Sequence, residues 1–136
     1  AIRQLSVFVE NKKGTLHEIT DVLAKSGIDL RSMCIADTSD YGIVRIIASE
    51  PERAKEILNS SGHAANVRSV TAFAVPDQPG GLAKVLSILE DNSIDIEYMY
   101  AFAHGENANV VIRPNNVNKC LHALKDCGCD IVSDIN

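Results

Sequence analysis

Apolar and polar residues alternate at the start of the chain and then adopt the spacing of a helix. Leu5, Val7 and Val9 fall at every second position, which is the period of a half-buried strand. Residues 11–14 have the composition of a loop, and apolar residues at helical spacing follow it up to Gly27, which is placed to end a helix. This stretch therefore predicts a strand, a loop and a helix.

The rest of the first half predicts two strands, a second helix and a last strand. Residues 28–36 and 42–48 are rich in β-branched side chains and are separated by turn-forming residues, so they predict a hairpin. A helix that ends at Gly62 and a strand over 66–71 complete the order β-α-β-β-α-β.

Both helices of the first half start with the spacing of a capping box, in which a Ser or Thr caps the helix and a Glu follows three residues later. Thr15 and Glu18 have this spacing in the first helix, and Ser49 and Glu52 have it in the second. We therefore expect the Thr15 and Ser49 side chains to cap these helices.

The second half repeats the first at a spacing of 66 residues and without a gap. The matched positions are Val9 and Val75, Gly14 and Gly80, Leu16 and Leu82, Leu23 and Leu89, Ile28 and Ile94, Asp29 and Asp95, Met33 and Met99, Val44 and Val110, Ile46 and Ile112, Leu58 and Leu124, and Gly62 and Gly128. The second half accordingly predicts a strand over 71–75, a loop over 76–80, a helix over 81–92, a hairpin over 94–114, a helix over 117–127 and a strand over 130–135.

This order of elements is typical of the ferredoxin-like fold. Split βαβ units form a four-stranded antiparallel sheet with both helices on one face. We expect an α+β protein of two such domains in tandem, residues 1–70 and 71–136.

Composition and charge exclude several classes of protein. The 136 residues are 46% hydrophobic and 23% charged, which is typical of a globular chain and not of a disordered one or a coiled coil. The net charge of −5 offers no attraction to nucleic acid or anionic lipid. No apolar run is long enough to span a membrane, and the first residues read as a strand, so we expect a cytoplasmic location.

The four cysteines are too few for a disulfide scaffold, so reduced thiols are expected. Cys127, Gly128 and Cys129 form a C-G-C segment, with Cys120 and His122 upstream, that has donor atoms for a soft metal. The spacing differs from the C-x-x-C loop of metal-transport domains. We therefore expect structural cysteines and no metal site.

Catalysis and RNA binding find little support in the sequence. No nucleophile, base and orienting group form a recognisable motif, so we expect no enzymatic activity. A ferredoxin-like RNA-binding domain needs aromatic residues on its central strands and a basic sheet, and Phe73 and Phe102 do not form that pattern.

The loops before the first helix of each half are the best candidates for ligand binding. A helix N-terminus presents unpaired amides and partial positive charge, which suit a carboxylate. Gly14, Gly80 and Gly81 let a ligand approach the backbone, and Asn11 and Asp77 add a polar side chain.

A second candidate group lies at the start of the second strand of each half. Asp29 and Asp95 stand there, and their carboxylates are candidates to bind an ammonium group. A carboxylate site and an ammonium site together describe a free amino acid. The alternative is that the glycines serve the turns and the aspartates are solvated turn residues.

Two segments of the second half resemble the signature of the ACT domain, a D-x-P-G-x-L loop and helix followed by a G-I-N-I strand start. Residues 76–86 read PDQPGGLAKVL and residues 93–96 read SIDI. The first half resembles the signature through NKKGTL at 11–16 and GIDL at 27–30. Because the resemblance covers both halves, the chain is similar to a tandem ACT protein.

The resemblance implies ligand-responsive regulation without chemistry and without a cofactor. ACT domains pair side by side or stack, and many bind an amino acid at the interface near the glycine loop, where an Asn or Asp contacts the ligand. Lys13 stands where the family has Pro, and Asp29 and Asp95 stand where it has Asn, so the two loops need not be equivalent. Met33 and Met99 are candidates to line the same interface, with a core role as the alternative.

The sequence thus predicts a non-enzymatic regulator that binds a free amino acid, forms a homodimer and modulates an enzyme, a transporter or its own assembly. No nucleic-acid or membrane partner is expected. The alternative is an ACT-like protein–protein interaction module without a small ligand. The candidate ligand-binding residues are Asn11, Lys12, Lys13, Gly14, Thr15, Leu16, Asp29, Met33, Asp77, Gln78, Gly80, Gly81, Leu82, Asp95 and Met99.

Overall fold

The computed structural model describes residues 1–10, 12–37, 41–133 and 135. The chain divides into two compact units, Arg3–Arg68 and Ser69–Ile135, and Ala1–Ile2 belongs with the second of them. We call these the N-terminal unit and the C-terminal unit. The candidate residue Asn11 lies outside the described residues.

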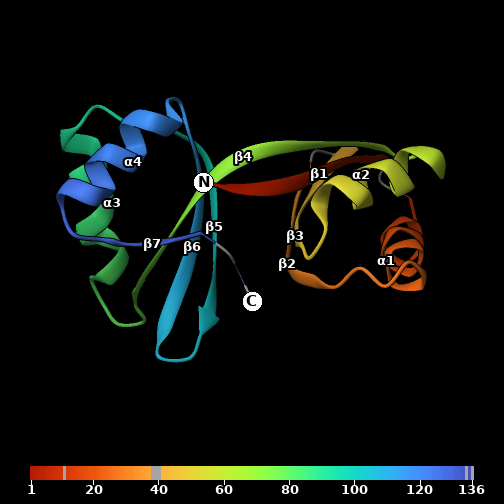
Figure 1. Ribbon diagram of the computed structural model, residues 1–136, viewed down its shortest axis with the longest axis horizontal. Helices are drawn as coiled ribbons and strands as arrows, with labels where there is room; N and C mark the ends of the chain where they lie inside the picture. The colour runs from red at the N-terminus through yellow and green to blue at the C-terminus, as the bar shows by residue number, and fades with distance from the viewer. Residues whose placement is uncertain (11, 38–40, 134, 136) are drawn as a thin grey trace. The chain divides into compact units, whose positions relative to one another are not determined.

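Each unit contains the predicted order of elements (Figure 1). The N-terminal unit has β1 (Ile2–Glu10), α1 (Thr15–Lys25), β2 (Leu30–Asp37), β3 (Tyr41–Ala48), α2 (Pro51–Ser60) and the first part of β4 (Ala64–Pro76). The C-terminal unit has the rest of β4, then α3 (Gly81–Asp91), β5 (Ile96–His104), β6 (Asn107–Pro114), α4 (Val117–Asp126) and β7 (Asp130–Val132). The predicted last strand is therefore shorter than expected, because β7 pairs with only three residues of β4.

The strand order is the same in both units. It is β2-β3-β1-β4 in the N-terminal unit and β5-β6-β4-β7 in the C-terminal unit. The pairs β1–β3, β2–β3, β4–β6, β5–β6 and β4–β7 are antiparallel. This is the predicted ferredoxin-like α+β fold, present twice.

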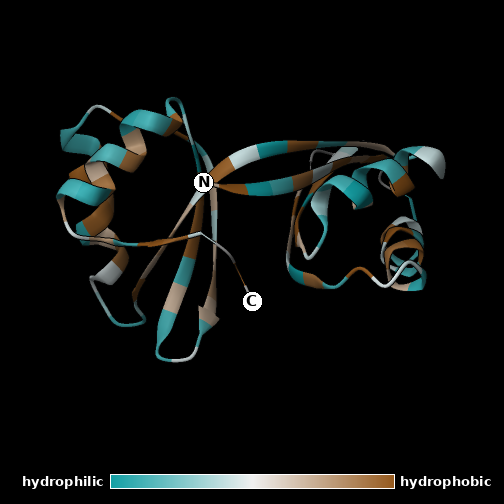
Figure 2. Ribbon diagram, viewed as in Figure 1, coloured by the Kyte–Doolittle hydropathy of each residue, from teal (hydrophilic) through white to brown (hydrophobic). Residues whose placement is uncertain are grey.

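Each unit has its own hydrophobic core between its sheet and its two helices (Figure 2). Leu5, Ile19 and Leu58 are fully buried in the N-terminal core. Phe73 and Leu124 are fully buried in the C-terminal core. Strand residues of period two and helix residues of period 3.6 meet there, as the apolar pattern predicts.

Neither predicted capping box forms. Gly14 precedes α1 with φ of 89°, and Thr15 is already helical, so its hydroxyl does not cap the helix. The second helix, α2, begins at Pro51, whose ring fixes the backbone angle that a first helical residue needs. Ser49 instead ties the start of β2 to the end of β3, because its Oγ accepts a hydrogen bond of 3.0 Å from the Asp29 amide.

The helix ends follow the predicted glycines, with one exception. Gly27, Gly62 and Gly128 stand just beyond α1, α2 and α4 with φ of 73°, 89° and 75°, the left-handed region that glycine enters without penalty. The position beyond α3 is occupied by Ser93, which has φ of 57°. The same turn is therefore made by a residue with a β-carbon.

Candidate functional site

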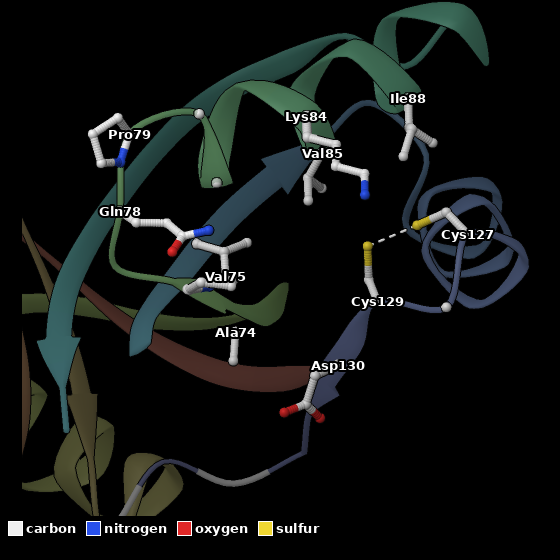
Figure 3. Close-up of a pocket in the computed structure, with 14 residues that line it drawn as sticks. Ala74, Val75, Gln78, Pro79, Lys84, Val85, Ile88, Cys127, Cys129 and Asp130 are labelled. Carbon is white, nitrogen blue, oxygen red and sulfur yellow. Dashed lines mark hydrogen bonds between the residues drawn. The ribbon is translucent and has the colours of Figure 1, made fainter. Parts of the chain in front are cut away.

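A cavity of about 500 Å³ opens in the C-terminal unit beside the loop that precedes α3 (Figure 3). Three segments form its walls: the end of β4 with its loop, the first turns of α3, and the turn from α4 to β7. The lining residues are Ala74, Val75, Pro76, Gln78, Pro79, Gly80, Gly81, Lys84, Val85, Ile88, Cys127, Gly128, Cys129 and Asp130.

The loop over 76–80 is held by backbone hydrogen bonds. The Gln78 amide donates to the Pro76 carbonyl at 2.9 Å, and the Asp77 amide donates to the Glu106 carbonyl of the β5–β6 turn at 3.1 Å. Gly80 caps α3 with φ of 86° and without a side-chain hydrogen bond. The first-turn amides of α3 therefore stand at the cavity without a capping side chain.

Ionic side chains of both signs line this cavity. Figure 3 shows the Lys84 side chain directed from α3 toward the α4–β7 turn, and Asp130 beside Cys129 at the start of β7 with its carboxylate directed away from Lys84. Within the described part of the chain, no ion pair joins either of them to another residue. The cavity thus combines a cation, an anion and a helix N-terminus.

The N-terminal unit has a cavity of about 390 Å³ at the corresponding place. It is lined by Phe8, Val9, Glu10, Lys12, Thr15, Glu18, Tyr41, Gly62, His63 and Ala64. His63 Nε2 lies 3.1 Å from Glu18 Oε1, so these two ionisable groups of the cavity are paired with each other. Lys12 Nζ lies 2.9 Å from Glu10 Oε2, and this hydrogen bond raises the pKa of Lys12.

The 66-residue repeat relates the two cavities residue by residue. Glu18 corresponds to Lys84, and His63 corresponds to Cys129. The backbone position is kept while the charge on the helix is reversed. The two cavities therefore differ in charge and in the groups that they offer for hydrogen bonds.

The sequence matches the family model for the ACT domain pair over residues 1–136. The chain belongs to the ACT domain pair family. Its two ACT domains are the two ferredoxin-like units described above, and the expected resemblance is confirmed over the whole chain.

Solved structures agree with this assignment. A crystal structure of a protein from Bacteroides thetaiotaomicron is 46% identical over 96% of this chain and 91% of that one, with a TM-score of 0.93. The regulatory subunit of aspartate kinase from Thermus thermophilus is 17% identical over 91% of each chain, with a TM-score of 0.69. That from Thermus flavus is also 17% identical, over 93% of this chain and 92% of that one, with a TM-score of 0.65. No curated protein matches the sequence.

Several of the predicted ligand residues do lie together at the ACT loops. Gln78, Gly80 and Gly81 line the C-terminal cavity. Lys12 and Thr15 line the N-terminal cavity. The remaining loop candidates do not line these two cavities. Lys13, Gly14 and Asp77 are exposed, and Leu82 packs against the C-terminal core. Leu16 and Ile35 line an adjoining hollow of about 150 Å³ that shares Lys12 and Thr15 with the N-terminal cavity.

Asp29 and Asp95 do not lie near the loop of their own ACT domain. The β1–β3 register pairs Glu10, beside the loop, with Tyr41 at the start of β3, whereas Asp29 is bonded to Ser49 beyond the other end of β3. Asp95 is bonded in the same way to Asn115, beyond the end of β6. Each aspartate therefore lies at the other end of the sheet from the loop of its own domain, because α1 and α3 each carry the chain along the sheet before the second strand begins.

The two methionines lie on the helix-covered face of their sheets. Met33 pairs with Ile46 and Met99 pairs with Ile112, and both isoleucines are core residues. Met99 packs against the C-terminal core, whereas Met33 is 43% exposed on the edge strand β2. The core alternative therefore holds for Met99, and Met33 offers an exposed apolar surface.

The sequence reasoning missed the side chains that give each cavity its character. These are Glu18, His63, Lys84 and Asp130, with Cys127 and Cys129 considered only as metal ligands. The signal was present in the repeat, because the turn after the second helix of each half returns beside the loop that follows its first strand. Comparing the two halves at this turn would have found them.

Metal binding and membrane insertion have no support in the described residues. They hold no group of three or more His, Cys, Asp or Glu side chains placed to bind a metal ion. Within the same residues, no helix has both the length and the hydrophobicity needed to cross a membrane.

Proposed function

We propose that this ACT domain pair is a non-enzymatic regulatory sensor that binds a free amino acid, with domains over residues 1–70 and 71–136 and a cytoplasmic location. The proposal rests on the C-terminal cavity, which is lined by the N-terminus of α3, by Lys84 and by Asp130. A free amino acid has one carboxylate and one ammonium group. Its charges match those of the cavity.

The ligand carboxylate is assigned to the α3 end of the cavity. Gly80 and Gly81 keep side chains away from the first-turn amides, and the helix dipole adds partial positive charge there. Lys84 adds a full positive charge on the same helix. The ligand ammonium then faces Asp130, whose carboxylate is an acceptor for its hydrogen bonds.

The N-terminal cavity supports a different role. Glu18 and His63 already pair with each other, so a zwitterion would have to break that contact to bind. Lys12 and Thr15 remain candidates for a second, weaker site. Asp29 and Asp95 are kept as ligand residues only for a site that a second copy of the chain completes.

A thermal-unfolding screen of the purified chain against the common amino acids tests the proposal. A ligand at one hundred times its dissociation constant adds about 2.7 kcal/mol to the folded state, which raises the melting temperature by several degrees. The proposal predicts a selective rise with one amino acid or a small related group. A flat panel at millimolar concentrations contradicts it.

Matched variants locate the ligand. Lys84→Gln and Asp130→Asn each remove one charge of the cavity and keep its shape, and we expect each to weaken binding at least about tenfold. Lys125→Gln removes an exposed charge from α4, outside the lining residues, and serves as the control. Equal affinity in Lys84→Gln and the control contradicts the assigned site.

A role as a protein-interaction module is the second candidate, and one observation favours it. Among the described residues, the large hydrophobic side chains that are exposed all lie in the N-terminal unit: Phe8, Leu16, Met33, Ile35 and Tyr41. The Phe8 and Tyr41 rings lie 5.2 Å apart on one face of the sheet. We propose that the surface formed by Phe8 and Tyr41 supports homodimer formation or contact with a regulated enzyme or transporter.

Light scattering of the purified chain tests the homodimer. We expect a mass of twice 14.7 kDa for the parent chain and a shift toward 14.7 kDa for Tyr41→Ser or Phe8→Ser. A monomer at all concentrations leaves a partner protein as the occupant of this surface.

A further inference from the structure

We propose that Cys127 and Cys129 form a reversible dithiol–disulfide pair at the C-terminal cavity, with a low-molecular-weight disulfide such as oxidised glutathione as the oxidant. This site does not depend on amino-acid binding. It assigns to the two thiols a redox chemistry in place of the structural role that their sequence suggests.

The turn between α4 and β7 brings the two sulfur atoms together. Cys127 caps the end of α4, Gly128 follows with φ of 75°, and Cys129 precedes β7. Because the left-handed glycine reverses the chain, both side chains point to the same side of the turn (Figure 3). Their Sγ atoms lie 2.7 Å apart, in hydrogen-bond contact. An ordinary disulfide bond of about 2.05 Å therefore requires only a small approach of the two sulfur atoms.

Both thiols are open to a small oxidant. Cys127 is exposed, Cys129 is half-buried, and both line the cavity of about 500 Å³. Cys120, by contrast, is buried in the core of the same unit. An oxidant that diffuses into the cavity meets the pair before it meets any core thiol.

The two thiols have different parts in the reaction. Cys127 is the more exposed of the two thiols and meets the oxidant first, whereas burial raises the pKa of the Cys129 thiol to about 11. The nearby Lys84 ammonium opposes this rise in pKa, and it favours the Cys129 thiolate that attacks in the second step of the reaction.

The reaction is two successive thiol–disulfide exchanges. The Cys127 thiolate attacks one sulfur of the oxidant, breaks its S–S bond and releases one thiolate. Cys129 then attacks the Cys127 sulfur, forms the internal S–S bond and releases the second thiolate. The two cysteines lose two electrons and two protons in all, the oxidant gains the electrons, and its two thiolates take up the protons. Excess thiol reverses both steps.

The pair occurs in one ACT domain only. The residues at the corresponding positions of the N-terminal unit are Ser61 and His63, which cannot form a disulfide. Oxidation therefore ties the end of α4 to the start of β7 beside one cavity, and leaves the other cavity chemically unchanged.

Peptide mass spectrometry of the whole folded chain tests the proposal. The protein is equilibrated at neutral pH in buffers of increasing oxidised-to-reduced glutathione ratio, and free thiols are then trapped with iodoacetamide. Trypsin cleaves after Lys125, so residues 126–136 carry both cysteines of the pair, whereas Cys34 and Cys120 fall in other peptides. In oxidising buffer we expect this peptide to lose both alkylation sites and to be two hydrogens lighter, and we expect excess thiol to restore both sites.

Single variants provide the matched controls. In Cys129→Ser we expect a glutathione adduct to persist on Cys127, because the resolving thiol is gone, and in Cys34→Ser we expect the parent behaviour. Two alkylated cysteines across the whole series, or an adduct on Cys127 as the end product in the parent chain, would overturn the proposal. An internal disulfide that forms only in denaturant would overturn it as well, since it would not require the folded turn.

Discussion

The cavities of the N-terminal and C-terminal units share a backbone and differ in almost every polar side chain. Helix, loop and turn stand in the same places, 66 residues apart, yet Glu18 and His63 in one unit are replaced by Lys84 and Cys129 in the other. Core residues are constrained by packing, whereas residues that face a cavity are not. A duplicated fold can therefore keep its architecture while its two sites acquire separate chemistry.

The difference extends to the pairing of the ionisable side chains that line the two cavities. In the N-terminal unit the ionisable side chains satisfy each other through the 3.1 Å contact of His63 and Glu18. In the C-terminal unit Lys84 and Asp130 face the same cavity, and the described residues provide no ion-pair partner for either. An unpaired cation and anion are free to bind charges of a ligand.

The largest predicted effect tests whether the two cores are equivalent. Leu23→Ala and Leu89→Ala remove corresponding leucines that are 0% and 1% exposed, and each should lower the free energy of unfolding of its unit by about 2–5 kcal/mol. Urea unfolding measures the loss. The exposed His17→Ala on α1 is the control and should stay within about 0.5 kcal/mol. A large loss from only one leucine would mean that the cores are not equivalent.

The next effect concerns the loops. A β-carbon on Gly81 would lie 2.5 Å from the Pro76 carbonyl oxygen, so Gly81→Ala forces the loop to move and should cost about 1–3 kcal/mol. Thr15 occupies the corresponding position of the first loop and carries a β-carbon already, so Thr15→Ala should change stability by no more than about 0.5 kcal/mol. Chemical denaturation of both variants gives the comparison. Equal losses would contradict the difference between the loops.

A smaller change in stability is expected at the helix ends, where one substitution should stabilise the chain. Ser93 adopts φ of 57° where the first unit has Gly27 at 73°. Ser93→Gly should therefore stabilise the chain by about 1 kcal/mol, and Gly27→Ser should destabilise it by a similar amount. The two melting temperatures, read against that of the parent, check the prediction. A stabilised Gly27→Ser variant would be inconsistent with these backbone angles.

The smallest effect is a pH dependence of stability that arises from an ion pair present in the N-terminal unit and not at the corresponding positions of the C-terminal unit. Arg3 Nη2 donates to Glu52 Oε1 at 2.8 Å, and this hydrogen bond lowers the pKa of Glu52. The corresponding residues of the C-terminal unit are Ser69 and Asn118, which cannot form an ion pair. The pKa of Glu52 is lower in the folded state than in the unfolded state, where it is about 4.5. The carboxylate therefore adds to the free energy of unfolding at pH values above 4.5, and this stabilisation is lost as the pH falls through the folded-state pKa.

Melting curves from neutral to acidic pH test this sign. Glu52→Gln should melt slightly below the parent at neutral pH, and the difference should vanish in acid. Asn118→Asp serves as the control, since it introduces a carboxylate at the corresponding position without an arginine at Ser69. A difference that grows toward acid pH would have the wrong sign.

Much of the fold followed from local patterns in the sequence. Alternating Leu5, Val7 and Val9 identified a strand, and Gly27 and Gly62 identified helix ends, because these signals depend on neighbours close along the chain. The capping boxes failed at Thr15 and Ser49. The capping-box pattern considers only two residues three positions apart. It does not take into account that Gly14 and Pro51 fix where α1 and α2 begin.

The loop of the candidate site was also visible in the sequence, but the surroundings of that loop were not. Gly80 and Gly81 could be assigned from a short motif, since a helix N-terminus is a local structure. Cys129 and Asp130 reach the same cavity as Lys84 only because β7 returns beside β4, which is a pairing between segments far apart in the chain. The place of Asp95 was not visible for the same reason, because strand register decided which end of the sheet it occupies.

The sequence by itself determined that this chain is a duplicated βαββαβ protein, because hydrophobic period, turn residues and a repeat of 66 residues are properties of the chain order. The resemblance of its loop motifs to the ACT signature gave the family. Only the tertiary structure decided which side chains meet. Strand pairing brings the turn from α4 to β7 beside the loop before α3, and that proximity gave the C-terminal unit a cavity lined by both Lys84 and the two thiols.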